Sequence, residues 1–304
     1  MSARLLLLCP GQGGQHAGMF DLARTDARAA ALLDACGLPA GAPESMFDNR
    51  VAQPAIVGAT LAMWEALRRR VAAPSLVAGY SVGELSAYGV AGALDPVDAV
   101  RLAATRAQLM NGAATATATG TEMQALAAIS GLPSAHARAL VQENGFAIAI
   151  VTGHDSCIAG GFDAALAQLE RAVASAGGRL QRLPIGIASH TALMAPAVAP
   201  FADALMAAPF RAQACPVLSG INAATITGKQ RAVNTLSRQL SETIVWDDCM
   251  DGCAEAGITV ALELGPGAAL ARMLQARHPH IACRSVADFR SLDGIVAWLG
   301  RQVG

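Results

Sequence analysis

The stretch VAGYSVGEL, residues 77–85, places a serine between two glycines where an apolar run gives way to a helical pattern. Gly79 and Gly83 lack a Cβ atom, so a strand can turn sharply into a helix there and leave Ser81 strained and exposed at the bend. This arrangement is typical of a nucleophile elbow. It also arises by chance in a chain with 30 glycines, so the rest of the sequence has to support it.

The composition indicates a globular protein with a large core. Hydrophobic residues make up 53% of the 304 residues, charged residues make up 15%, and the formal net charge is -1. This length favours one large domain with an insert, or two domains. Acidic and basic residues are scattered along the chain without a block of either sign, which argues against a nucleic-acid or anionic-membrane partner.

The seven cysteines include no CxxC pair, so we expect a reduced, cytoplasmic protein without a disulfide scaffold. Cys249 and Cys253 lie on one face of a predicted helix, but no histidine or second cysteine pair accompanies them. We therefore expect buried side chains there and no metal site. At the N-terminus four leucines follow Arg4, a run too short for a secretion signal. We predict a buried first strand and no membrane-spanning segment.

The first half of the chain alternates short apolar runs with longer helical patterns, which favours an α/β fold with a parallel sheet. Strands are expected at residues 5–9 and 75–80, and helices at residues 53–70, 82–94 and 96–110. The same pattern returns after residue 188, with strands at 216–221 and 259–264 and helices at 192–207 and 267–278. Together with the elbow, it predicts a large α/β-hydrolase-like domain formed by residues 1–117 and 188–304.

Residues 118–187 have a different pattern. The small polar tract NGAATATATGTE, residues 111–122, looks like a crossing linker. Strands are then expected at residues 123–130, 146–152, 156–161 and 179–185, and helices at 133–145 and 162–178. Because the order βαββαβ is that of a ferredoxin-like unit, we predict a small ferredoxin-like domain inserted into the large one.

A serine hydroxyl needs a base within hydrogen-bond reach to act as a nucleophile at neutral pH. His190 lies where the chain leaves the insert and re-enters the large domain, a junction that can face a ligand cleft. The simpler alternative is that His190 only begins a helix. An acyl-transfer intermediate also needs hydrogen-bond donors for its oxyanion. Val82 follows the nucleophile, and Gln12 lies in the loop after the first strand, at the same edge of the predicted sheet.

Further motifs accompany the elbow along about residues 5–275. Their order and spacing resemble those of the malonyl-CoA:acyl carrier protein transacylases. The motifs are Gly11-Gln12-Gly13, Gln53-Pro54-Ala55, the elbow at residues 79–84, Arg106, Ser189-His190 and Gly265-Pro266-Gly267.

This resemblance implies a role for each matching residue. Ser81 is the acylated nucleophile and His190 its base, and Gln12 with the Val82 amide forms the oxyanion hole. Arg106 holds the free carboxylate of the malonyl group through a two-pronged ion pair, which an arginine fits better than a lysine. The implied substrate is malonyl-CoA, the acceptor is the phosphopantetheine-type thiol of an acyl carrier protein, and no metal or redox cofactor takes part.

The resemblance also implies roles for residues around this set. Gln53 supports the loop beside the substrate and, together with Gly11 and Tyr80, belongs to the substrate-binding residues. In the family a backbone carbonyl just before a tryptophan orients the histidine, which makes Val245 the candidate here.

Two departures from the family pattern bear on the pathway. The residue before the nucleophile is usually histidine and is Tyr80 here, and the tract after Arg106 reads GTEMQ in place of GTGAM. Together with CPGQGGQ near the start, these features look more like the malonate decarboxylase transacylase (epsilon) subunit, whose partners include a small carrier protein and other decarboxylase subunits.

Other functions remain open on the sequence. One is a malonyl transacylase of fatty-acid or polyketide synthesis. A second is a patatin-like serine esterase or thioesterase, in which Asp293-Gly294 would supply the partner of the serine. A third is a subunit that only binds a carrier protein.

Overall fold

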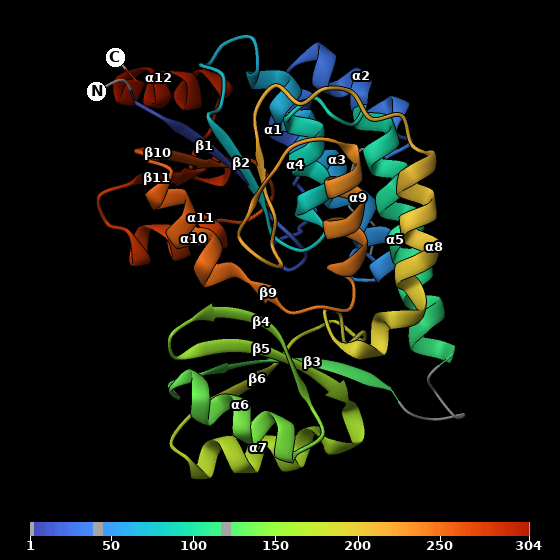
Figure 1. Ribbon diagram of the computed structural model, residues 1–304. Coiled ribbons are helices and arrows are strands. Elements are labelled where there is room, and N and C mark those ends of the chain that lie inside the picture. Colours follow the sequence, from blue (N-terminus) through green and yellow to red (C-terminus); the bar gives the residue numbers. More distant parts are fainter. Residues whose placement is uncertain (1–2, 39–44, 117–122, 304) are drawn as a thin grey trace.

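The computed structural model describes residues 3–38, 45–116 and 123–303. Their strands form a larger and a smaller sheet, which lie one above the other in Figure 1. Helices pack on both faces of the larger sheet, whereas α6 (Ser134–Glu143) and α7 (Leu166–Ser175) cover the outer face of the smaller one. The two ends of the chain lie close together beside α12 (Leu292–Val303), far from the smaller sheet.

The larger sheet is parallel except at one edge. Its strands, in spatial order, are β11 (Ala282–Ser285), β10 (Val260–Glu263), β1 (Leu5–Cys9), β2 (Leu76–Gly79), β7 (Val217–Leu218) and β8 (Thr225–Ile226). Neighbouring strands run parallel from β11 to β7, and β8 pairs antiparallel with β7. The parallel α/β sheet expected from the sequence is confirmed.

The position of β1 at the centre of the sheet explains why its sequence is apolar throughout. Alternate side chains of a strand point to opposite faces of the sheet, and both faces are covered here. Leu5 and Leu7 pack into one hydrophobic cluster, and Leu6 and Leu8 pack into another. Each fully buried leucine contributes about 1.5–3 kcal/mol to folding.

The helices divide between these two clusters. The cluster that contains Leu5 and Leu7 is completed by α1 (Asp21–Arg24), α2 (Ala27–Ala35), α3 (Asn49–Leu67), α4 (Gly83–Val90), α5 (Pro96–Ala116), α8 (Ala195–Ala207), α9 (Lys229–Arg238) and α12. The opposite cluster is completed by α10 (Trp246–Glu255), α11 (Ala269–Arg277) and residues of the smaller sheet. Short 3-10 turns occur at Asp163–Ala165, Ala192–Met194 and Val286–Asp288.

The smaller sheet contains the βαββαβ order that the sequence predicts. Its four consecutive strands are β3 (Gln124–Ser130), β4 (Ala147–Gly153), β5 (Ser156–Phe162) and β6 (Arg179–Arg182), with α6 and α7 between them. The spatial order is β6-β3-β5-β4-β9. The fifth strand, β9 (Ile244–Val245), comes from a distant part of the chain and pairs parallel with β4. The sequence did not predict it, because two residues are too few to show an alternating pattern.

Several predicted boundaries differ from the structure, and two of the differences have a physical cause or change the interpretation of a segment. Helix α3 begins at Asn49, earlier than expected, because the Asp48 side chain caps it by accepting a hydrogen bond from the Arg50 amide. Helix α5 continues to Ala116, so the linker predicted to begin at residue 111 is wrong over residues 111–116. The remaining linker residues, 117–122, lie outside the described residues. Across the described ranges, no helix has both the length and the apolarity that crossing a membrane requires.

Candidate active site

The elbow forms where β2 ends and α4 begins. Ser81 has a positive φ of 55°, a conformation that L-residues rarely adopt. A Cβ atom on Gly83 would lie 2.1 Å from the carbonyl oxygen of Cys9, and one on Gly79 would lie 2.4 Å from the backbone of Glu84. Both glycines are therefore required by close backbone approach, which supports the steric reason inferred from the sequence.

His190 completes a hydrogen-bonded pair with the serine. Its Nε2 atom lies 2.8 Å from Ser81 Oγ, and its Nδ1 atom lies 2.6 Å from the carbonyl oxygen of Gln239. A carbonyl only accepts hydrogen bonds, so Nδ1 carries the proton and Nε2 is free to take one from the serine. His190 also has a positive φ, of 62°, and its amide donates to the carbonyl of Leu240 at 2.8 Å.

The prediction that the Val245 carbonyl orients the histidine is wrong, because that contact is made by Gln239. Gln239 is the C-cap of α9, and the last carbonyls of a helix have no partner within the helix. The imidazole supplies that partner. Val245 instead lies in β9, where its amide donates to the carbonyl of Gly220. The end of the amphipathic pattern in α9 was the sequence signal that could have indicated Gln239.

The imidazole is held in its neutral form. Burial lowers the pKa of His190 to about 3, and the nearby positive charge of Arg106 acts in the same direction. The hydrogen bond to the Gln239 carbonyl opposes these effects only in part. At neutral pH the histidine is therefore unprotonated and available as a base.

Arg106, on α5, brings a buried positive charge next to the serine. The residue is 2% exposed. One guanidinium nitrogen donates to Gln53 Oε1 at 2.8 Å, and the other lies 3.5 Å from Ser81 Oγ and from Gln239 Oε1. Arg106 forms no ion pair with the described residues, and burial lowers its pKa to about 10.

Gln53 links Arg106 to the loop after β1. Its Nε2 atom donates to Asn49 Oδ1 at 2.6 Å and lies 3.5 Å from Gln12 Oε1. Gln53 is fully buried, so these contacts fix the amide that receives the guanidinium. The structure thus places Gln53 in contact with Arg106 and within 3.5 Å of Gln12.

Two backbone amides are available near the hydroxyl. Among the residues described, the amides of Val82 and Gln12 have no hydrogen-bond acceptor. The loop that contains Gln12 lies against the elbow, since a Cβ atom on Gly11 would be 2.7 Å from the carbonyl oxygen of Tyr80. Free amides beside a nucleophile are the donors that an oxyanion requires.

A cavity of about 490 Å³ lies between the two sheets, beside the serine, the histidine and the loop that contains Gln12. Gly11, Gln12, Tyr80, Ser81 and His190 line it on the side of the larger sheet. The smaller sheet and the segment that follows it contribute the apolar side chains of Leu126, Ile150, Ile158, Leu183 and Ile185. Such a cleft can hold an extended, mainly apolar chain that ends at the serine.

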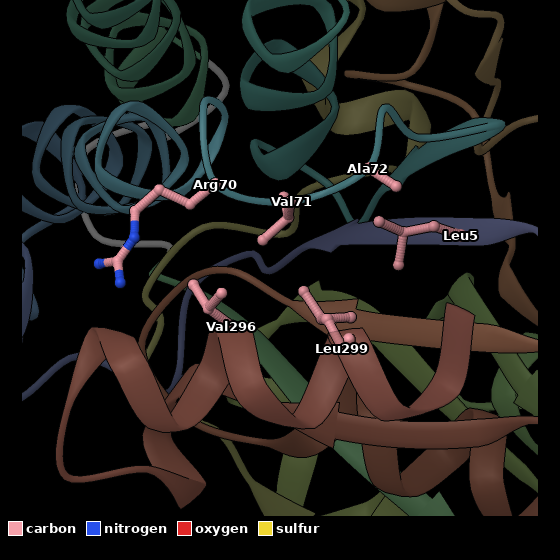
Figure 2. A pocket seen from close by; sticks show the side chains of 7 residues that line it. Leu5, Arg70, Val71, Ala72, Val296 and Leu299 are labelled. Carbon is pink, nitrogen blue, oxygen red and sulfur yellow. The ribbon is translucent and has the colours of Figure 1, made fainter. Parts of the chain in front are cut away.

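A second cavity, of about 320 Å³, lies at the opposite end of β1. Val296 and Leu299 of α12 face Leu5 and Val71 across it (Figure 2). None of the predicted site residues lines this cavity. The Asp293-Gly294 pair lies on α12, and the Asp293 carboxylate pairs with Arg70 rather than with the serine and histidine. In the described ranges, no group of three or more His, Cys, Asp or Glu residues is placed to hold a metal ion.

Known proteins resemble this chain along most of its length. The family model described as the acyl transferase domain matches residues 40–288. The chain belongs to the acyl transferase domain family. The acyltransferase is 32% identical over 304 residues to the malonyl CoA-acyl carrier protein transacylase of Mycobacterium tuberculosis, an alignment that covers 95% of this chain and 98% of that protein. It is also 32% identical over 278 residues to the protein of that name from Escherichia coli K12, with 86% and 88% of the two chains covered.

Solved structures of similar proteins share the whole fold of the acyltransferase. An acyl-carrier-protein S-malonyltransferase from Burkholderia pseudomallei superposes with a TM-score of 0.88 at 26% identity, covering 97% of this chain and 99% of that one. A malonyl-transacylase solved in complex with a type II polyketide synthase acyl-carrier protein gives a TM-score of 0.88 at 26% identity, with 98% and 100% covered.

Proposed function

We propose that this acyltransferase moves a malonyl group from malonyl-CoA to the phosphopantetheine-type thiol of an acyl carrier protein, through a malonyl ester on Ser81. The observation that carries the proposal is the buried guanidinium of Arg106, which lies 3.5 Å from the serine hydroxyl without an ion-pair partner in the described chain. A malonyl group on the serine presents a carboxylate at about this distance. The names of the similar proteins point to the same reaction.

In the first half-reaction, Ser81 Oγ attacks the thioester carbonyl of malonyl-CoA while His190 Nε2 takes its proton. The carbonyl oxygen becomes an oxyanion, and the amides of Val82 and Gln12 stabilise it. When the C–S bond breaks, the imidazolium returns the proton to the leaving sulfur. Coenzyme A departs as a thiol, and the malonyl group remains on the serine as an ester.

In the second half-reaction, the carrier's thiol gives its proton to His190 as its sulfur attacks the ester. The C–O bond then breaks, and the imidazolium returns the proton to Ser81. The products are the malonyl thioester of the carrier and free enzyme. In this scheme the Gln239 carbonyl holds the Nδ1 proton throughout, and no metal or redox cofactor takes part.

Arg106 makes the site selective for acyl groups that carry a carboxylate. A malonyl carboxylate pairs with the guanidinium, whereas an acetyl group leaves the buried charge without a partner. Removing one partner of a buried charged pair costs about 2–5 kcal/mol. We therefore expect strong preference for malonyl-CoA over acetyl-CoA.

Intact-mass spectrometry after brief mixing with malonyl-CoA or acetyl-CoA tests the proposal. We expect one malonyl adduct on the wild-type chain, none on Ser81→Ala, and transfer of the adduct when a carrier protein with its thiol arm is added. A chain that gains no malonyl adduct would rule out the reaction. Steady release of free malonate without a carrier would instead indicate a hydrolase.

The carrier is proposed to be the small carrier subunit of a malonate decarboxylase, acting with the other subunits of that enzyme in the cytoplasm. Tyr80 before the nucleophile supports this choice, and it packs edge-on against Trp246 with ring centroids 5.2 Å apart. The test is the rate of malonyl transfer to two purified carriers, one from malonate decarboxylase and one from fatty-acid synthesis. Faster transfer to the fatty-acid carrier would contradict this assignment.

We further propose that β3 to β6 with α6 and α7 form a separate ferredoxin-like domain, and that the rest of the chain forms a hydrolase-like domain.

A further inference from the structure

Glu84 is a buried acid beside the site that the reaction above does not use. It is the last residue of the elbow motif, lies in the first turn of α4 and is fully buried. Its Oε2 atom accepts a hydrogen bond from Gln239 Nε2 at 2.5 Å and another from the Gly220 amide at 3.0 Å. A buried carboxylate costs several kcal/mol unless such donors compensate it, so the arrangement needs an explanation.

Gln239 connects this carboxylate to both functional side chains. Its backbone carbonyl accepts from His190 Nδ1 at 2.6 Å, and its side-chain Oε1 lies 3.5 Å from a guanidinium nitrogen of Arg106. A carboxylate only accepts hydrogen bonds and a guanidinium only donates them. The Gln239 amide therefore satisfies both neighbours only when Nε2 faces Glu84 and Oε1 faces Arg106.

The backbone at Gly220 packs closely against the contact between Glu84 and Gln239. A Cβ atom at Gly220 would lie 3.2 Å from Glu84 Oε2 and 3.4 Å from Gln239 Nε2, so only glycine lets its backbone approach without pressing on the pair. The carboxylate thus joins α4, the end of α9 and the segment after β7 at one point. A side chain placed in this way controls how the residues it holds are oriented.

We propose that Glu84 is a positioning residue, which acts through Gln239 to hold the His190 imidazole and the Arg106 guanidinium in the geometry that acyl transfer needs. The inference rests on the proposed function in that His190 is taken as the base. Without the carboxylate, the Gln239 amide is free to turn its NH₂ group towards the guanidinium. The end of α9, which presents the Gln239 carbonyl to His190, then loses its hydrogen bond to Glu84.

The charge of Glu84 gives this role a pH dependence. Burial raises the pKa of Glu84 to about 7, against the opposing effects of the Gly220 amide, Gln239 and Arg106. The other titratable groups that interact with it are Tyr88 on the same helix and Cys249 on α10, and burial raises the pKa of both. As pH falls through about 7, Glu84 becomes protonated and its hold on Gln239 weakens. His190, with a pKa near 3, contributes no titration in that range.

A fluorophosphonate probe tests the role without relying on the natural substrate. Ser81 Oγ displaces fluoride from phosphorus and His190 takes the hydroxyl proton, so the labelling rate reports on this pair whatever acyl group the enzyme prefers. If malonyl-CoA is not the substrate, the malonyl adduct fails to form but the labelling experiment still applies.

Two variants separate the geometry from the charge. Glu84→Leu removes the acceptor, and we expect labelling to slow by about 10- to 100-fold. Glu84→Gln keeps an acceptor oxygen but has no charge. We expect an intermediate rate that does not change with pH and equals the wild-type rate at low pH.

The control variant is Leu85→Ala, on the next residue of α4, whose side chain is buried in the hydrophobic cluster that contains Leu5 and Leu7. It should lower the midpoint of thermal unfolding and leave the labelling rate unchanged. A folded Glu84 variant that labels at the wild-type rate near pH 8, or a Gln variant that keeps the wild-type pH profile, would overturn the proposal. Should neither variant fold, a wild-type labelling rate that is constant between about pH 6 and about pH 8 would overturn it as well.

Discussion

The two ends of strand β1 open onto cavities that are both lined largely by apolar side chains but differ in the polar groups around them. At its carboxyl end, within the described residues, two non-glycine residues have positive φ angles, two backbone amides lack acceptors, and Arg106 is buried without an ion pair. At its amino end the apolar side chains of Leu5, Val71, Val296 and Leu299 line the cavity (Figure 2). Arg70, which also lines it, is paired with the exposed Asp293. Strain and unpaired polar groups lower the stability of a fold, so their concentration at one end marks the place where a ligand supplies the missing contacts.

The strongest test of this comparison is removal of the nucleophile. We expect Ser81→Ala to lower the rate of malonyl transfer by about 10⁴-fold or more, because Ser81 supplies the hydroxyl that lies 2.8 Å from His190 Nε2. The assay is transfer from malonyl-CoA to a carrier protein, with thermal unfolding as the check of folding. Substantial residual transfer would place the chemistry elsewhere.

The next test compares Arg106, which lies beside the serine, with Arg70, which lines the cavity at the opposite end of β1. Arg106→Ala should lower kcat/KM for malonyl-CoA by roughly 100-fold or more, because the malonyl carboxylate loses its only buried cation in the described site. Its relative activity on acetyl-CoA should rise. Arg70→Ala is the matched control, and transfer rates with both substrates should stay at the wild-type level. Equal effects of the two substitutions would remove the distinction between the cavities.

The free energy of unfolding should respond in opposite directions to alanine at Gly83 of the elbow and at Gly112 of α5. Gly83→Ala forces a Cβ atom to within 2.1 Å of the Cys9 carbonyl oxygen, and we expect it to lower the free energy of unfolding by about 1–3 kcal/mol. Gly112 is the control, because it lies in α5 and a Cβ atom there would meet no neighbouring atom within 4 Å. Gly112→Ala should raise the free energy of unfolding by about 0.5–1 kcal/mol. Denaturant unfolding measures both, and a neutral Gly83→Ala would contradict the steric argument.

The smallest effect is expected at the end opposite the serine. Asp293→Ala removes an exposed ion pair with Arg70, worth about 0–1 kcal/mol, and should leave acyl transfer unchanged. The same variant tests the patatin-like alternative. Loss of all serine reactivity in Asp293→Ala would mean that this aspartate reaches the nucleophile.

Local rules predicted much of the fold. The four leucines of β1 and the glycines of the elbow have short-range causes that can be read from neighbouring residues. Strand β9 could not be predicted in this way, because its two residues become a strand only by pairing with β4. Helix α5 passed through a polar tract that was interpreted as a linker, since tertiary packing overrides weak local preference.

In the candidate site, too, some residues could be predicted from sequence motifs and others could not. Ser81, His190, Arg106 and Gln53 lie at positions the motifs indicated, and the structure brings them together. The carbonyl that orients the histidine was misassigned to Val245, because loop length alone does not show which carbonyl a helix end leaves free. Glu84 belongs to the quoted motif, but its contact with Gln239 spans 155 positions of sequence and needs coordinates to be seen.

Strand β9 has one more consequence. It belongs to the smaller sheet by its hydrogen bonds, yet along the chain it follows the segment whose carbonyls hold the His190 ring and amide. Only a few residues of the chain therefore separate the carbonyls that orient His190 from the strand that pairs with the wall of the cleft. A displacement of the smaller sheet would therefore also shift the carbonyl that holds the His190 ring.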